Sequence, residues 1–145
     1  MTRRVLLVED EPNIIEAIRF ILSRDGWQVS THSDGTTAVD AVLRAGADVV
    51  VLDVMLPGRS GFDILKDLRA HPETGDLPVL MLTAKGQGRD RDLAERYGAT
   101  RFMTKPFSNA EVVAAVNAIA RSGPETDDRG IGGATADKAP ADRSG

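Results

Sequence analysis

The sequence contains no cysteine and only two histidines in its 145 residues. The absence of cysteine excludes a disulfide framework, a thiolate nucleophile and any zinc-thiolate or iron–sulfur site. Two isolated histidines are also a poor ligand set for a transition metal. This composition fits a reducing compartment, so we expect a cytoplasmic protein, and any metal it binds should be held by oxygen ligands.

Long hydrophobic runs and basic runs are missing as well. The first apolar stretch, Val5 to Val8, stops at Glu9, far short of the ~20 residues that a membrane span needs. The chain has 18 basic and 22 acidic residues, which gives a formal net charge of −4. No cluster of Lys and Arg offers the phosphate contacts on which nucleic acid or anionic lipid binding depends. We therefore expect neither a membrane nor direct nucleic acid as a partner.

The last part of the sequence offers little from which to build a core. From Pro124 onward, Ile131 is the single large apolar residue among mostly small and polar ones. Such a segment buries too little apolar surface to offset the entropy lost on ordering. We predict one folded domain over residues 1–123 and a disordered tail or linker over residues 124–145.

Within the folded part, short apolar runs rich in β-branched residues predict five strands. These runs are Val5 to Val8, Trp27 to Thr31, Val49 to Leu52, Val79 to Leu82 and Thr100 to Met103. Between them lie stretches with apolar residues at helical spacing, strongest over residues 14–22, 62–68 and 112–119 and weaker over residues 38–43 and 93–97. We expect Phe20 and Trp27 to be core or packing residues.

Cap signals agree with this division of the chain. Ser60 and Ser108 are predicted N-caps, and Gly46 lies where a helix should end. Strands that alternate with helices in this way predict an α/β fold, a (βα)5 domain with a doubly wound parallel sheet covered on both faces. Ligands of such sheets gather at the carboxyl ends of the strands.

Polar residues collect at those predicted strand ends. Glu9 and Asp10 follow the first strand, Asp53 follows the third, Thr83 ends the fourth and Lys105 follows the fifth. Strand ends are often polar merely because they are solvated. Asp53, however, interrupts an otherwise apolar run, where an unpaired charge is costly. Crowded carboxylates favour a hard divalent cation, and a cation opposite a lysine and a hydroxyl suits a phosphoryl group, with a carboxylate as nucleophile.

Four motifs in this order resemble the receiver domain of two-component response regulators, with a match over residues 3–121. They are VLLVEDEP, VVVLDVMLPGRSGFDIL, PVLMLTA and MTKPF. The resemblance implies a flavodoxin-like five-stranded sheet with strand order 2-1-3-4-5. It further implies that Asp53 accepts a phosphoryl group from a sensor histidine kinase or a histidine phosphotransfer protein.

The resemblance also assigns roles to the other residues of the site. Glu9, Asp10, Asp53 and the carbonyl of Met55 are expected to bind Mg²⁺ or Mn²⁺, and Lys105 to contact the phosphoryl oxygens. The backbone N–H of Ala84 is expected to donate to the phosphoryl group. Thr83 and Phe102 match the switch hydroxyl and the switch aromatic, which together alter the surface made by the fourth helix, fifth strand and fifth helix.

Thr100 and Arg101 stand where many members of the family carry an Asp-Asp pair that forms a charged-pair dimer, so we expect a monomer or weak dimer here. The expected protein is not an enzyme with a separate substrate, but a phosphoacceptor that catalyses its own phosphorylation and dephosphorylation. Its output is a downstream target protein or onward phosphate relay, either as a stand-alone receiver or as a fragment of a longer regulator.

Two other functions remain open from the sequence. One is a degenerate receiver that acts only as a docking module. The other is an aspartate-nucleophile phosphohydrolase similar to the haloacid dehalogenase class, which needs an acid two residues after its nucleophile. Met55 occupies that position here.

Overall fold

The computed structural model describes residues 3–84 and 88–121, and within them five parallel strands form one sheet. The order across the sheet is β2-β1-β3-β4-β5, as predicted. The strands are β1 (Arg3–Val8), β2 (Trp27–His32), β3 (Val49–Asp53), β4 (Val79–Thr83) and β5 (Arg101–Thr104). The last four strands each run one residue past their predicted apolar end, because backbone pairing continues beyond the last apolar side chain.

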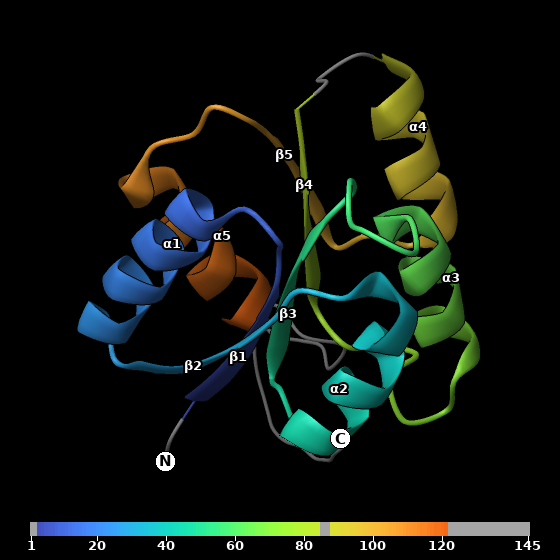
Figure 1. Cartoon of the computed structure of the whole chain (residues 1–145), viewed down its shortest axis with the longest axis horizontal. Coiled ribbons are helices and arrows are strands. Elements are labelled where there is room, and N and C mark those ends of the chain that lie inside the picture. The colour runs from blue at the N-terminus through green and yellow to red at the C-terminus, as the bar shows by residue number, and fades with distance from the viewer. Residues whose placement is uncertain (1–2, 85–87, 122–145) are drawn as a thin grey trace.

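Five helices cover both faces of the sheet (Figure 1). α1 and α5 lie on one face, and α2, α3 and α4 lie on the other. The helices are α1 (Pro12–Arg24), α2 (Ala38–Ala45), α3 (Gly61–Ala70), α4 (Gly88–Tyr97) and α5 (Asn109–Arg121), with a short 3-10 helix η1 (Gly35–Thr37) before α2. None of the helices in the described ranges is long and apolar enough to cross a membrane.

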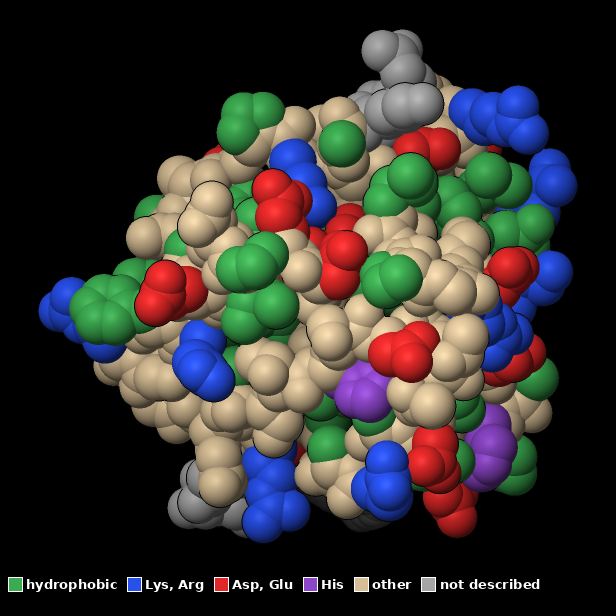
Figure 2. All heavy atoms as spheres, in the orientation of Figure 1, with side chains coloured by type: hydrophobic (Ala, Val, Ile, Leu, Met, Phe, Trp, Pro, Cys, Tyr) green, Lys and Arg blue, Asp and Glu red, His purple; other side chains and the backbone are tan. Residues whose placement is uncertain are grey.

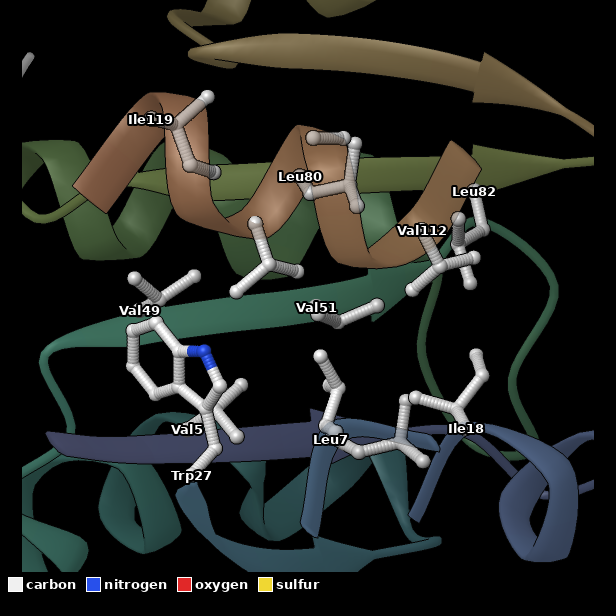
Figure 3. Packing of buried hydrophobic residues seen from close by; sticks show 13 residues of the cluster. Val5, Leu7, Ile18, Trp27, Val49, Val51, Leu80, Leu82, Val112 and Ile119 are labelled. Carbon is white, nitrogen blue, oxygen red and sulfur yellow. The ribbon is translucent and has the colours of Figure 1, made fainter. Parts of the chain in front are cut away.

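The central strand β3 explains why its sequence is almost uninterruptedly apolar. Val49 and Val51 point into the core beneath α1 and α5, which Figure 3 shows. Val50 and Leu52 point into the second core, against α2, α3 and α4. Successive side chains of a strand face opposite sides of the sheet, so a strand covered on both sides must be apolar at every position. Only at its carboxyl end does β3 carry a charge, on Asp53.

The predicted helix caps are present. The Ser60 hydroxyl accepts a hydrogen bond from the backbone N–H of Phe62 at 3.1 Å, at the start of α3. At the start of α5, the backbone N–H of Glu111 donates to the Ser108 hydroxyl at 3.1 Å, and that of Ser108 donates to the Glu111 carboxylate at 2.7 Å. Gly46 ends α2 with a φ of 60°, which favours glycine. These caps fix where α3 and α5 begin.

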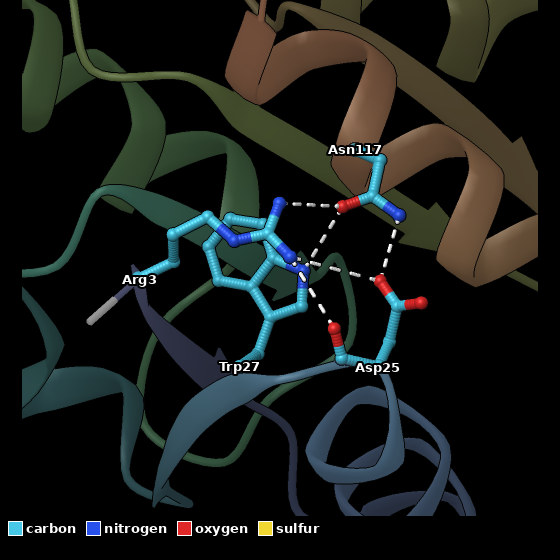
Figure 4. Close-up of polar contacts among 4 residues, drawn as sticks. All are labelled: Arg3, Asp25, Trp27 and Asn117. Atoms are coloured by element: carbon cyan, nitrogen blue, oxygen red, sulfur yellow. Dashed lines mark hydrogen bonds and ion pairs between the residues drawn. The ribbon is translucent and has the colours of Figure 1, made fainter. Parts of the chain in front are cut away.

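A polar network joins α5 to the amino-terminal end of the sheet (Figure 4). The Asn117 side-chain oxygen accepts hydrogen bonds from Arg3 and from the Trp27 indole, each at 3.1 Å. The Asn117 amide donates to the Asp25 carboxylate at 2.8 Å, and the Arg3 guanidinium lies 4.4 Å from the centre of a Trp27 ring. Trp27 is buried, as predicted. The network therefore ties the first strand, the end of α1 and the last helix together.

The prediction that Phe20 is a core or packing residue is wrong. Its side chain is 60% exposed and lies 5.6 Å from the Arg24 guanidinium. α1 buries Ile18 and Leu22 instead. Phe20 is two residues from each of them, which places it on the far side of a helix with 3.6 residues per turn. The predicted tail at residues 124–145 lies outside the described residues.

Candidate functional site

The polar residues expected at the strand ends do lie at one edge of the sheet. Asp53 is the last residue of β3, and Thr83 is the last residue of β4. Glu9 and Asp10 follow β1 directly, and Lys105 follows β5. Because all the strands are parallel, their carboxyl ends meet at the same edge. In Figure 2, acidic side chains gather around a basic one in the upper middle of the molecule.

Three carboxylates form a compact group at this edge. One oxygen from each of Glu9, Asp10 and Asp53 lies within 4.8 Å of the other two. Glu9 and Asp53 are buried, at 0% and 2% exposure, whereas Asp10 is exposed. The backbone continues the sheet at this point, since the Glu9 N–H donates to the carbonyl of His32 at 3.0 Å. Glu9 and Asp53 are therefore held inside the protein at the edge of the sheet, and Asp10 lies at the surface beside them.

The Lys105 ammonium lies among these carboxylates. Its Nζ is 3.2 Å from Asp53 Oδ1, 3.5 Å from Glu9 Oε1 and 4.0 Å from Glu11 Oε1. The Lys105 backbone N–H donates to the carbonyl of Thr83 at 2.7 Å, which fixes the start of the side chain beside β4. Glu11 was not assigned to the site from the sequence, and the structure adds it as a neighbour of Lys105.

Burial and charge set the protonation of the group. Burial, and next the negative charge of Asp53, raise the pKa of Glu9 from 4.5 to about 7. Burial acts to lower the pKa of Lys105, but the charges of Asp53, Glu9 and Glu11 outweigh it and raise that pKa. Lys105 is therefore an ammonium at neutral pH.

The cluster formed by the Glu9, Asp10 and Asp53 carboxylates has oxygen atoms that are available to a ligand. Glu9 Oε1 and Asp53 Oδ1 are buried, and within the described part of the chain neither accepts a hydrogen bond. Both lie within ion-pair distance of the Lys105 ammonium and close to each other. Buried charges that are incompletely paired are costly, and carboxylate oxygens are the ligands of hard divalent cations. This donor set fits a divalent cation.

The two predicted switch residues both contact α4. The Thr83 hydroxyl, on a residue only 1% exposed, donates to Asp90 Oδ2 at 2.9 Å. The Phe102 ring is half-buried, and the Arg91 guanidinium lies 5.7 Å from its centre. The sequence did not predict a part for Asp90, because only the packing of α4 beside β4 brings it to Thr83.

The remaining predicted residues flank the carboxylates. Met55 lies two residues beyond β3 with a side chain 72% exposed, and Ala84 directly follows β4. α3 begins beside the backbone of Asp53, where the Gly61 N–H donates to the carbonyl of Val54 at 2.8 Å. A Cβ on Gly61 would clash with the Asp53 carbonyl oxygen. The motif that contains Gly61 was noted in the sequence, but this close approach was not predicted.

Comparison with known proteins identifies the family of the chain. A family model described as response regulator receiver domain matches residues 5–117. The sensory transduction protein RegX3 of Mycolicibacterium smegmatis is 40% identical over 126 residues, which make up 87% of this chain and 54% of RegX3. The phosphate regulon transcriptional regulatory protein PhoB of Escherichia coli is 42% identical over 121 residues, 83% of this chain and 53% of PhoB. The chain thus spans about half the length of these curated relatives.

A solved structure agrees as well. The receiver domain of the sensor histidine kinase PA1611 from Pseudomonas aeruginosa, with a magnesium ion coordinated in its active-site cleft, matches with a TM-score of 0.77 and 29% identity. The match covers 84% of this chain and 100% of that domain. Since the family model spans most of the chain and the fold agrees with a solved receiver domain, this chain belongs to the response regulator receiver domains of two-component signal transduction.

Proposed function

We propose that this receiver domain accepts a phosphoryl group on Asp53 from the phosphohistidine of a sensor histidine kinase or phosphotransfer protein. The observation that carries the proposal is the buried Asp53 carboxylate, which lies 3.2 Å from the Lys105 ammonium inside an acidic group. The modification then changes the surface of α4, β5 and α5, which contacts a downstream target protein or passes the phosphoryl group on.

The chain's own residues account for the chemistry of transfer. A carboxylate oxygen of Asp53 attacks phosphorus in line, an O–P bond forms, and the P–N bond to the donor imidazole breaks with its electron pair left on nitrogen. Lys105, 3.2 Å from Asp53, is the proposed cation that neutralises charge on the phosphoryl oxygens. The Ala84 N–H and the Thr83 hydroxyl are the proposed hydrogen-bond donors to those oxygens. The acyl phosphate is later hydrolysed by water, so the domain is a phosphoacceptor that assists its own turnover.

Glu9, Asp10, Asp53 and the carbonyl of Met55 are the residues that would hold Mg²⁺ or Mn²⁺. The buried oxygens of Glu9 and Asp53 that accept no hydrogen bond from the described residues support this assignment, and the PA1611 receiver domain was solved with magnesium. A bound divalent cation supplies neutralising charge to the transferring phosphoryl group.

Magnesium is expected to stabilise the protein through the three carboxylates. A ligand that binds only the folded state adds about 1.4 kcal/mol at ten times its Kd, which raises the Tm by several degrees. Asp10→Asn should remove most of this rise in a thermal melt, because it deletes a ligand charge at an exposed position without touching the core. Asp40→Asn, an exposed aspartate on α2, is the matched control and should keep the full rise. An unchanged rise in Asp10→Asn would contradict the ligand assignment.

The proposed function is tested by incubating the protein with Mg²⁺ and acetyl phosphate or phosphoramidate. Intact-mass spectrometry should show the addition of one phosphoryl group that hydroxylamine removes, as expected for an acyl phosphate. Chelation of the metal with EDTA should prevent the addition. If no phosphoryl group is added by these donors or by a phosphorylated histidine protein, the domain is a docking module and the proposal fails.

A further inference from the structure

We propose that Asp90 of α4 is a positioning residue that holds the Thr83 hydroxyl in its unphosphorylated arrangement and competes with the phosphoryl group for its proton. The inference rests on the proposed phosphorylation of Asp53. It identifies the residue that keeps the Thr83 hydroxyl from turning to the phosphoryl group. It comes from one hydrogen bond, from Thr83 Oγ1 to Asp90 Oδ2 at 2.9 Å.

The chemistry of a hydroxyl makes this bond a competitor. A threonine hydroxyl carries one proton and donates one strong hydrogen bond at a time. Here Thr83 uses that proton in a hydrogen bond to a carboxylate. Charge-assisted hydrogen bonds of this kind are stronger than those between neutral groups. Thr83 is buried beside β3, whose end carries Asp53. Donation to a phosphoryl group on Asp53 therefore requires that the bond to Asp90 be broken.

The position of Asp90 in its helix favours this role. It lies in the first turn of α4, where backbone N–H groups favour a negatively charged side chain. The next residue, Arg91, places its guanidinium 5.7 Å from the centre of the Phe102 ring. Two consecutive residues of α4 thus contact the two residues predicted to act as the switch.

α4 is also the helix best suited to respond when the bond breaks. Ala94 is its single buried residue, whereas α3 buries four residues over the same length. A helix with few buried contacts reorients at low cost. If the Thr83 hydroxyl donates its hydrogen bond to the phosphoryl group instead of to Asp90, the first turn of α4 is released. The Asp90 bond thereby links phosphorylation to the surface that includes α4.

The test uses beryllofluoride as a phosphoryl mimic, titrated in the presence of saturating Mg²⁺ and followed by fluorine NMR. Asp90→Ala should lower the Kd about threefold to tenfold, because the state with a released Thr83 hydroxyl becomes more populated. Asp90→Asn keeps an acceptor oxygen without the charge and should give an intermediate Kd. Asp92→Ala, on the same helix and exposed, should bind as the native protein does.

A double-variant cycle separates positioning from a general effect on α4. In the Thr83→Ala background, Asp90→Ala should no longer alter the Kd, because the shared hydrogen bond is already absent. A native or weaker affinity of Asp90→Ala, or tightening that persists without Thr83, would overturn the role of Asp90 and leave the proposed function standing. Failure of the native protein with Mg²⁺ to bind beryllofluoride at all would overturn both.

Discussion

The Asp53→Asn variant is expected to take up no phosphoryl group from acetyl phosphate and Mg²⁺ under conditions that fully modify the native protein. The amide oxygen of asparagine is neutral and a far weaker nucleophile than a carboxylate oxygen. Asparagine has nearly the same shape as aspartate, so it fits the buried position at the end of β3. Its carbonyl oxygen still faces the Lys105 ammonium. Loss of modification would therefore report chemistry at one atom and not a change of fold.

The control for this experiment is Asp40→Asn, which makes the same chemical change on the exposed surface of α2. It should be modified at the native rate, and circular dichroism should show the native fold for both variants. Peptide mapping of the native protein should place the label on the segment that contains Asp53. Stoichiometric, hydroxylamine-labile phosphate on the Asn variant would show that a different carboxylate is the acceptor.

The Gly61→Ala variant is expected to lower the free energy of unfolding by about 2–4 kcal/mol. The added Cβ would meet the Asp53 carbonyl oxygen, and the Val54 Cα would lie at 2.9 Å. Both atoms belong to backbone that is held in place by a hydrogen bond from the Val54 N–H to the Leu82 carbonyl at 2.9 Å. The start of α3 would have to move away from the strand that carries Asp53.

Gly88→Ala is the matched control, because a Cβ on Gly88 meets nothing within 4 Å among the described residues. Alanine is the better helix former by up to ~1 kcal/mol, so this variant should be as stable as the native protein or slightly more stable. Urea denaturation measures both. Equal free energies of unfolding for the two variants would show that α3 tolerates the displacement.

The fold was predictable from the sequence because short apolar runs mark the strands and apolar residues at helical spacing mark the helices. The apolar runs of β1, β3 and β4 could be recognised directly, and the parallel arrangement then brought Glu9, Asp53 and Lys105 to one edge. Asp53 stood out because it is a charge at the end of a fully apolar strand. These features depend on local pattern and on topology, both of which a single sequence contains.

The features that were missed depend on how neighbouring elements pack. Phe20 is the exception, because the 3.6-residue period of α1 is enough to place it on the side of the helix away from Ile18 and Leu22. Asp90 resembles any acidic residue in a first helical turn until α4 is placed beside Thr83. Gly61 resembles an ordinary loop glycine until α3 is seen to begin against the backbone of Asp53. Side-chain contacts of this kind follow from tertiary structure, which periodicity alone does not specify.

The network at the amino-terminal end of the sheet makes the fluorescence of Trp27 a natural probe of α5. Trp27 is the single tryptophan of the sequence, it is 3% exposed, and its indole nitrogen is bonded to Asn117 of α5. Undocking of α5 would bring water and a new polar environment to the indole, while events confined to the carboxylate edge occur at the other end of the strands. Intrinsic fluorescence therefore follows the attachment of the last helix without a label.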